Sequence, residues 1–519
     1  MRMKKASVNV FINFITVIIG FFPAFVLRKY FLNTFGNDML GLVSLFTNII
    51  GLLSIAELGI GSAIIYSMYK PFAEQNKEKI KGYLQYYARF YRNVGGVIFA
   101  AGLATLPFLH LFIDRQIHLA DAQRYFLLFL ADTLISYFFS YKLCMLIVAQ
   151  DEYKVALATV LSKVSICALQ LLVIHLFPNF YVFILAQIFV NLVYFVSMNA
   201  YINKRYSWLR NAQGRIDQEE KSSLIRNIRA LFMHKIGGTI VFGIDNMMIS
   251  AFINLTTVGI FNSYYMVIGA AQTIISKALS GVTASIGNML TEGNASTAYR
   301  VHRRLFFISF WIVSVVAIGI FNTIEPFIHL WLGPGQTLDR LTICIVMLNF
   351  YFTLMRGSVE RFKEGAGIYH QDRYAPLFEA AINLAASVLL VRWIGLPGIF
   401  LGTLISNLSV IFWLKPKLVY NLVFRKPLLD YFRLYFTYLF IASIPLAASA
   451  FATYRLQAAT GFGAFALNVI VNLLIVNLSH FIFLRKTEEY TYFKDLIVRI
   501  VQNKLLPKVR KQRLAEREY

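Results

Sequence analysis

The chain alternates long apolar segments with short polar ones from one end to the other. Apolar runs recur along it, for example at 8–27, 155–177 and 464–484, and about 20 apolar residues are what a helix needs to cross a bilayer. Hydrophobic residues make up 58% of the 519 residues and charged residues 15%, whereas a soluble domain carries about 25% charged residues. The pattern therefore predicts an all-α, polytopic membrane protein.

The distribution of basic residues predicts which loops face the cytoplasm. The formal net charge is +24, but the lysines and arginines gather in alternate loops instead of forming one basic surface. The basic segments are 2–5, 70–81, 204–221, 300–304, 361–373, 415–426 and 485–517. Because basic loops remain cytoplasmic, we predict an even number of spans with both termini in the cytoplasm, and no nucleic-acid partner.

Hydrophobicity predicts about fourteen transmembrane helices. Their expected ranges are 7–31, 39–69, 83–113, 122–148, 154–177, 180–202, 228–252, 256–290, 303–325, 340–363, 374–393, 397–418, 431–452 and 461–485. The three cysteines, Cys144, Cys167 and Cys344, all fall inside these ranges. Their spacing fits buried thiols better than a disulfide framework or a zinc site.

Three pairs of segments repeat at a separation of about 220 residues. PFLHLF at 107–112 recurs as PFIHLW at 326–331, and AQDEY at 149–153 recurs as HQDRY at 370–374. FLNTFGNDMLGLVSLF at 31–46 corresponds to FINLTTVGIFNSYY at 252–265. A shared offset in the same order indicates an internal duplication, and an even number of spans makes the repeat parallel.

The repeat sets the expected domain boundaries. We predict a six-helix N-terminal lobe at 1–202, a cytoplasmic inter-lobe linker at 203–227 and a six-helix C-terminal lobe at 228–418. Two additional helices at 419–485 and a basic cytoplasmic tail at 486–519 would follow. Two related lobes in one membrane protein are typical of transporters that work by alternating access.

Ionisable residues inside the predicted spans indicate a hydrated cavity. A charge at bilayer depth costs at least ~3 kcal/mol, so each needs a partner or water. We expect four cationic residues to bind substrate: Lys277, Lys235, Arg89 and Arg356. Lys277 is expected near the middle of the span 256–290. Arg89 and Lys235 lie nearer the predicted span ends, where snorkelling to the interface is the alternative.

Acids and glycines in two spans are candidates for coupling or gating. They are Glu57, Asp245, Gly59 and Gly61. The repeat places Glu57 opposite Ser276 or Lys277, which suggests an acid facing a base or, alternatively, a structural salt bridge. Asp245 suits a proton or cation site, or a hydrogen bond between helices. Motifs such as HExxH and GxSxG are absent from the sequence, so we predict no catalytic residue, no metal ligand and no enzyme activity.

Two stretches carry a family resemblance. AELGIGSAIIYSMYKPFAEQNKEKI at 56–80, followed by YYARFYR at 86–92, and FGIDNMMIS at 242–250 resemble Wzx-type polysaccharide and O-antigen flippases of the MATE-like multidrug/oligosaccharidyl-lipid/polysaccharide superfamily. The resemblance implies translocation of an undecaprenyl-diphosphate-linked oligosaccharide, as used for lipopolysaccharide, across the bacterial inner membrane. It implies no cofactor, leaves coupling to H⁺ or Na⁺ open, and suggests membrane lipids and other polysaccharide assembly proteins as partners.

Two other functions are compatible with a polytopic chain. A MATE-type multidrug or cation antiporter would share the two lobes, but the excess of intramembrane lysine and arginine favours an anionic cargo. A membrane polysaccharide polymerase is the second alternative, and such enzymes need a larger outer loop than any here.

The segment after the last span is expected to form an interfacial helix. Its apolar residues follow the i, i+3, i+4, i+7, i+8 spacing of one helix face. They are Phe493, Leu496, Ile497, Ile500 and Val501. Lysines and arginines lie between them and suit anionic headgroups. A solvated basic tail is the alternative.

Overall fold

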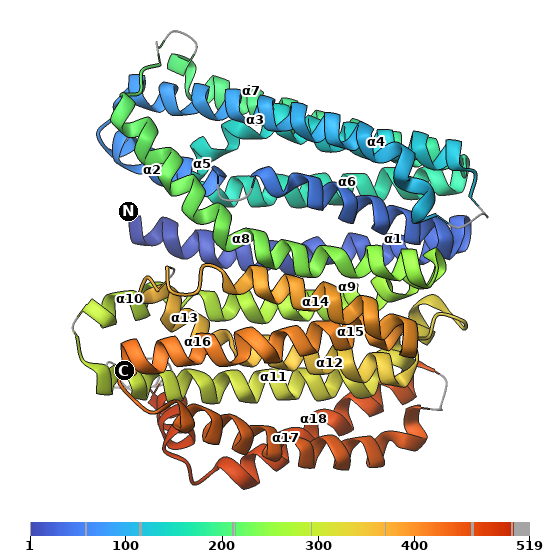
Figure 1. The fold of residues 1–519 in the computed structure, drawn as a ribbon, viewed down its shortest axis with the longest axis vertical. Helices are drawn as coiled ribbons and strands as arrows, with labels where there is room; N and C mark the ends of the chain where they lie inside the picture. The colour runs from blue at the N-terminus through green and yellow to red at the C-terminus, as the bar shows by residue number, and fades with distance from the viewer. Residues whose placement is uncertain are drawn as a thin grey trace, which may run out of the picture. The chain divides into compact units, whose positions relative to one another are not determined.

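The computed structural model (Figure 1) describes residues 2–502 except 58, 59, 114–116, 210, 211, 213, 292, 369, 458–460, 500 and 501. Side chains are not described at 2–11, 13, 14, 56, 227, 229–242, 280, 284 and 455–457. Within the described residues the regular structure is helical and contains no strand. This confirms the prediction of an all-α chain.

The helices follow one another with short connections. The first part of the chain contains α1 (Arg2–Leu53), η1 (Ser54–Glu57), α2 (Ile60–Ala73), α3 (Lys77–Thr105), η2 (Leu106–Leu111), α4 (Leu119–Phe139), η3 (Ser140–Leu143), α5 (Cys144–Val148), α6 (Glu152–Leu176), α7 (Phe180–Arg205), η4 (Ser207–Leu209), α8 (Gln218–Phe252) and α9 (Leu255–Ser280). The remainder contains α10 (Thr283–Thr291), α11 (Ala295–Leu332), α12 (Arg340–Met355), α13 (Gly357–Gly365), α14 (Ala375–Ile394), α15 (Leu396–Ser406), η5 (Asn407–Ile411), α16 (Phe412–Val419), η6 (Tyr420–Phe424), α17 (Leu428–Gln457) and α18 (Phe462–Leu484). A further helix occupies residues 488–499.

Local sequence signals explain several helix ends. Asn76 caps α3, since its side chain accepts a hydrogen bond from the Lys79 amide at 3.0 Å. Asn179 caps α7 in the same way and accepts from the Tyr181 amide at 2.8 Å. Asparagine is among the preferred N-cap residues because its short side chain reaches these unpaired amides. Gly395, with φ of 65°, ends α14 and turns the chain directly into α15.

Twelve helices among the described residues are long and apolar enough to cross a membrane. The second and seventh predicted spans are not among the twelve as separate helices. Gly36, where φ is 80° and ψ is 177°, is a kink that divides α1 into two helices at the place where the first two predicted spans meet. The candidate span Ile15–Leu53 runs across this kink. The seventh predicted span lies in α8, and most of its side chains are outside the described set. The described residues therefore contain twelve candidate spans where fourteen were predicted.

The chain forms two compact units. The first contains Met1–Lys277, Trp331–Asn349 and Tyr369–Leu414, and the second contains Ala278–Leu330, Phe350–Ile368 and Lys415–Tyr519. The first unit thus includes helices from both halves of the sequence repeat. The predicted lobe, linker and tail boundaries rest on the repeat and stay a prediction.

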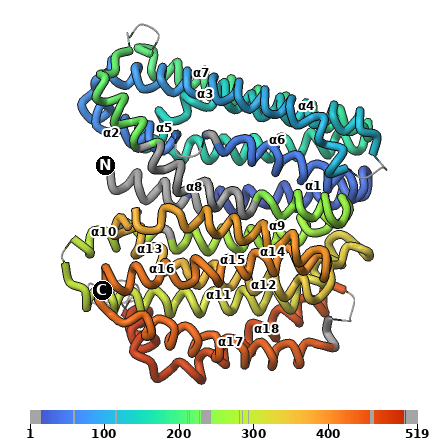
Figure 2. Tube along the Cα trace, viewed as in Figure 1, coloured from blue at the N-terminus to red at the C-terminus, as the bar shows by residue number. Residues whose placement is uncertain are grey.

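Helices pack closely within each unit. In the first, α4 lies between α3 and α7, α1 packs against α6 and α8, and α14 packs against α15 and α8 (Figure 1). In the second, α17 and α18 lie side by side (Figure 2).

Buried polar side chains join α17 and α18 to α11. Asn322 of α11 donates to the Ser449 hydroxyl at 2.9 Å and to the Asn472 side chain at 2.6 Å. Asn472 in turn donates to Asn468 at 2.6 Å. All four side chains are buried. Because a bilayer offers apolar helices no hydrophobic driving force to associate, such hydrogen bonds, each worth about 1 kcal/mol, help to select the neighbours.

The helix at 488–499 packs one face on α11. Glu489 forms an ion pair with Arg303 at 2.8 Å, the guanidinium of Arg304 lies 3.6 Å from the Tyr492 ring centre, and Phe493 stacks on Phe307 at 5.9 Å. Leu496 and Ile497 are exposed. The helix is present as predicted, but Phe493 contacts protein instead of joining the exposed apolar face. Ile500 and Val501 lie outside the described residues.

Replacing Phe493 with alanine is expected to lower the stability of the purified protein by about 1–2 kcal/mol, because a partly buried ring loses its packing on Phe307. The control is Val498→Ala on the same helix, since Val498 is 43% exposed. Thermal unfolding in detergent measures both. An equal loss of stability in the two variants would show that the contact between Phe493 and Phe307 does not fix this helix on α11.

Candidate functional site

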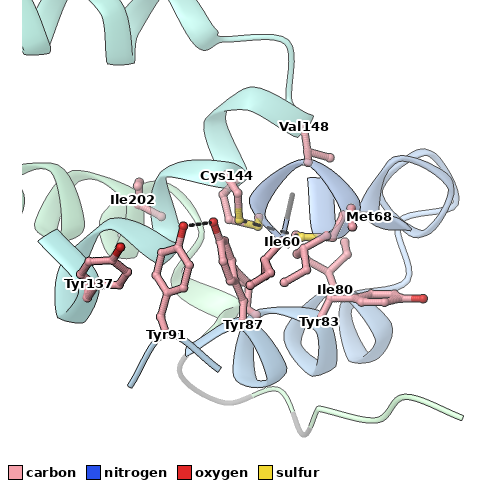
Figure 3. Close-up of a cluster of buried hydrophobic side chains, with 14 of the residues drawn as sticks. Ile60, Met68, Ile80, Tyr83, Tyr87, Tyr91, Tyr137, Cys144, Val148 and Ile202 are labelled. Carbon is pink, nitrogen blue, oxygen red and sulfur yellow. Dashed lines mark hydrogen bonds between the residues drawn. The ribbon is translucent and has the colours of Figure 1, made fainter. Parts of the chain in front are cut away.

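Glu57 lies in a short 3-10 turn, η1, where α1 gives way to α2. Its carboxylate accepts a hydrogen bond from the Tyr91 hydroxyl at 2.7 Å. The Tyr87 hydroxyl in turn donates to the Tyr91 hydroxyl at 2.8 Å, as Figure 3 shows. The Tyr137 hydroxyl lies near the same carboxylate. Helices α3 and α4 thus bring tyrosines around one partly buried acid.

Gly61 makes this arrangement fit. A Cβ atom on Gly61 would lie 2.8 Å from the Tyr87 hydroxyl oxygen, which is closer than real Cβ contacts. The absence of a side chain at Gly61 therefore leaves room for the Tyr87 hydroxyl beside the backbone. Gly59 lies outside the described residues.

Among the described residues, the hydrogen bond to the Glu57 carboxylate comes from the Tyr91 hydroxyl and not from the Lys277 ammonium. The expected pairing of Glu57 with Lys277 is therefore not seen.

Lys277 is not in the middle of a span. Helix α9 ends at Ser280, two turn residues follow, and α10 begins at Thr283. The prediction of one span over 256–290 is wrong at this point, since the helix breaks beside Gly281. Lys277 is exposed and lies in the last turn of α9, where a cation interacts favourably with the helix dipole.

The other predicted cations have different surroundings. Arg89 is exposed on α3. Arg356 is buried, and its Nε donates to the Glu360 carboxylate at 2.9 Å, which also accepts from Lys415 at 2.7 Å. The side chain of Lys235 lies outside the described set. Arg356 belongs to the second unit, and Lys277 and Arg89 belong to the first.

Asp245 is part of a polar cluster built by three helices of the first unit. Asp245 on α8 lies near Thr403 of α15, and Asn383 of α14 donates to the Thr403 hydroxyl at 2.8 Å. Asp245 Oδ1 and Asn383 Oδ1 are buried and have no hydrogen-bond partner among the described residues. Buried oxygens without donors are costly, and carboxylate, amide and hydroxyl oxygens are ligands for hard cations. A proton or a hard cation would satisfy these two oxygens.

Arg28 is a cation that was not among the predicted site residues. Its Nε donates to the Ser263 hydroxyl at 3.1 Å, and its Nη2 donates to the Gly259 carbonyl and to Ser263, both at 3.1 Å. These acceptors on α9 are neutral, so they orient the guanidinium without balancing its charge. A partly buried guanidinium of this kind is suited to bind a phosphate or carboxylate.

The repeated segments meet at a close helix crossing beside Arg28. A Cβ atom on Gly41 of α1 would lie 2.0 Å from the Leu255 carbonyl oxygen, and one on Gly259 of α9 would lie 2.5 Å from the Asn37 carbonyl oxygen. Thr256 also donates to Asp38, 218 residues away.

The same offset relates all the pairs in this crossing. Gly41 and Gly259 are 218 residues apart in the sequence. The same separation relates Asn37 to Leu255 and Asp38 to Thr256. In one close contact the first repeated segment supplies the glycine and the second supplies the carbonyl group. In the other contact the second segment supplies the glycine and the first supplies the carbonyl group. The crossing is locally two-fold symmetric, as expected when duplicated segments pack on one another.

The family model for polysaccharide biosynthesis proteins matches residues 6–284, more than half of the chain. The chain belongs to this family. The match confirms the resemblance to Wzx-type flippases predicted from the sequence. No curated protein matches the sequence significantly.

Solved structures similar to this polysaccharide biosynthesis protein are transporters and flippases. The lipid II flippase MurJ in an inward closed conformation is 13% identical, covers 92% of this chain and 99% of its own, and has a TM-score of 0.68. An inward-facing multidrug resistance MATE family transporter of the MOP superfamily is 15% identical, with coverages of 77% and 95% and a TM-score of 0.61. A mutant of the Vibrio cholerae MATE transporter VcmN is 12% identical, with coverages of 81% and 98% and a TM-score of 0.57. At these identities the similarity shows the fold.

Proposed function

We propose that this protein is a flippase that moves an undecaprenyl-diphosphate-linked oligosaccharide across the bacterial inner membrane. The observation that carries the proposal is the match to the polysaccharide biosynthesis family, together with a fold shared with the lipid II flippase MurJ over 92% of the chain. The proposed mechanism is alternating access without any change in covalent bonds, so the protein is not an enzyme.

The cargo is expected to carry a diphosphate and a sugar. Arg28 offers a guanidinium held by neutral acceptors, and Lys277 and Arg89 are exposed cations in apolar helices. An anion is attracted to such groups more strongly in a water-poor cavity than in bulk water. We propose these three residues, with Lys235, as diphosphate contacts. Arg356, which is bound to Glu360, is a weaker candidate.

Ion coupling is proposed for the two acidic sites of the first unit. The cluster of Asp245, Asn383 and Thr403 offers buried oxygens without described donors, which H⁺ or Na⁺ would satisfy. Glu57, bound by the Tyr91 hydroxyl, would be the second group that changes its partners during the cycle. No cofactor is proposed.

The proposed orientation places both termini in the cytoplasm. It rests on the alternation of basic and short neutral loops in the sequence. The cargo would be an O-antigen or other polysaccharide repeat unit, and membrane lipids and other polysaccharide assembly proteins would be the partners.

A MATE-type multidrug antiporter is the second candidate. The similarity to the MATE transporter and the two buried or partly buried acids favour it. A cationic drug, however, would be repelled by Arg28, Lys277 and Arg89.

Deleting the gene in its native host is expected to cause cytoplasmic-leaflet accumulation of a lipid-linked oligosaccharide and loss of the surface glycan, with recovery on expression of the wild-type chain. Mass spectrometry of extracted polyprenyl lipids and glycan staining measure the two effects. A deletion strain with normal surface glycan and increased drug sensitivity would instead establish the antiporter.

A further inference from the structure

The chain folds back along α3 after it leaves α7. The Leu209 carbonyl oxygen of η4 accepts a hydrogen bond from Lys81 Nζ at 2.6 Å, and the Arg215 amide donates to the Glu78 carbonyl oxygen at 3.2 Å. Both donor–acceptor pairs join the predicted inter-lobe linker to the first two turns of α3.

Two glycines allow the linker backbone to lie close to α3. A Cβ atom on Gly82 would lie 2.7 Å from the Arg215 carbonyl oxygen, and one on Gly214 would lie 2.3 Å from Gln85 Oε1. Any other residue at either position would push the linker away from the helix. The linker backbone is therefore seated on α3 by close packing as well as by hydrogen bonds.

A pocket of about 200 Å³ lies where the linker, α3, η3 and α7 meet. It is lined by Lys81, Leu84, Gln85, Ala88, Tyr141, Lys142, Asn203 and Leu209. All these residues belong to the first unit. A site for one water needs roughly 15 Å³ of such volume, so the pocket has room for a group much larger than a water molecule.

The lining is cationic. Its eight described residues include two lysines and no carboxylate. Lys81 donates to the Leu209 carbonyl, and Lys142 Nζ donates to the Asn203 side-chain oxygen at 3.0 Å. Both contacts hold an ammonium group at the wall of the pocket. By contrast, Lys79, which lies outside the lining, is paired with Glu220 at 2.7 Å.

We propose that this pocket binds a phosphate group, which Lys81 and Lys142 contact from the two helical walls that carry them. Lysine binds phosphate as a point charge, and an ammonium group has three donors, so each lysine can keep its protein acceptor and still reach an anion. The amides of Gln85 and Asn203 supply neutral hydrogen bonds. The phosphate belongs either to an anionic phospholipid headgroup or to a free phosphate ion.

Binding at this place would fasten the linker to α3. Lys81 of α3 already donates a hydrogen bond to Leu209 of the linker, and both residues line the pocket. A bound anion would therefore add a second connection between α3 and the linker. Because the linker connects the two halves of the repeat, its attachment would depend on the ligand. The inference concerns binding alone and does not depend on what the protein transports.

The test uses the full-length protein in nanodiscs of zwitterionic phosphatidylcholine. Two probes are compared: phosphatidylglycerol incorporated into the nanodiscs, and inorganic phosphate added at constant ionic strength. Thermal unfolding and hydrogen exchange of residues 206–217 are the readouts. We expect at least one probe to raise the unfolding temperature and to slow exchange in the linker.

Lys81→Gln and Lys142→Gln are each expected to weaken binding of the probe about tenfold, because each removes a charged hydrogen bond. Lys142→Arg is expected to retain most of the effect. The matched control is Lys77→Gln, since Lys77 is an exposed lysine on the same helix outside the pocket.

A response to phosphatidylglycerol alone identifies a lipid headgroup, and a response to inorganic phosphate identifies a free phosphate site. The proposal is overturned if neither probe acts on the wild-type protein. It is equally overturned if both Lys→Gln variants respond like the wild type, or if Lys77→Gln loses the response as well. If one of the two variants does not fold, the other still decides the outcome.

Discussion

Replacing Gly41 with alanine is expected to reduce transport at least tenfold. The new Cβ atom would lie 2.0 Å from the Leu255 carbonyl oxygen, and a backbone atom cannot move aside as a flexible side chain can. Overpacking of this kind costs about 1–3 kcal/mol or more, and helix crossings in membranes depend on small residues for their close approach. The crossing of α1 and α9 would open, and the Thr256–Asp38 hydrogen bond would be lost with it.

Gly259→Ala is expected to have the same effect, since its Cβ atom would lie 2.5 Å from the Asn37 carbonyl oxygen. Gly51→Ala is the matched control, because nothing lies within 4 Å of a Cβ atom at that position on the same helix as Gly41. Surface-glycan export measures transport, and oxidative cross-linking of an Asp38→Cys/Thr256→Cys pair reports whether the crossing is closed. Normal export with an unchanged yield of cross-link in Gly41→Ala would show that the close crossing of α1 and α9 is not needed for transport.

The helices and the repeat could be predicted because a bilayer imposes simple requirements. A spanning helix must be apolar over about 20 residues, so hydrophobic runs alone indicated where α3, α6 and α18 lie. The repeated segments at 31–46 and 252–265 were recognised from sequence, and the structure packs them against each other at Gly41 and Gly259. That they contact through a local two-fold axis could not be predicted, since an offset in sequence says nothing about which surfaces meet.

The position of Lys277 was predicted wrongly for a specific reason. The residues after it remain largely apolar, so hydropathy showed one run to residue 290, whereas the helix ends at Ser280. The tyrosines around Glu57 were missed as well, because Tyr87, Tyr91 and Tyr137 look like ordinary span residues until α3 and α4 pack beside η1.

Other site residues gave little signal. Asn383 and Thr403 are uncharged, and a search for intramembrane charges passes over them although they complete the Asp245 cluster. Arg28 lies within the first predicted span, 7–31, and was not predicted as a site residue. Its acceptors Gly259 and Ser263 are 231 and 235 residues away, and no local pattern records such a pairing.

Replacing Arg28 with alanine is expected to lower export at least tenfold while the protein still inserts into the membrane. The change removes a guanidinium that could make charged hydrogen bonds to the proposed diphosphate, each worth about 1.5–3 kcal/mol. Arg28→Lys should retain part of the activity, because the charge remains but the forked geometry is lost. Lys29→Ala is the matched control, since Lys29 is the adjacent exposed cation.

A structural role for Arg28 predicts a different set of results. If the guanidinium only joins α1 to α9, Ser263→Ala, which removes one of its acceptors, should lower the unfolding temperature and export together with Arg28→Ala. If Arg28 binds the cargo, Ser263→Ala should reduce export only in part, and Arg28→Ala should lose export with little change in unfolding temperature. Export of surface glycan at native expression and thermal unfolding of the purified variants separate the two cases. Normal export from Arg28→Ala would exclude a role in binding the diphosphate, and the proposed cationic contacts would then be limited to Lys277, Arg89 and Lys235.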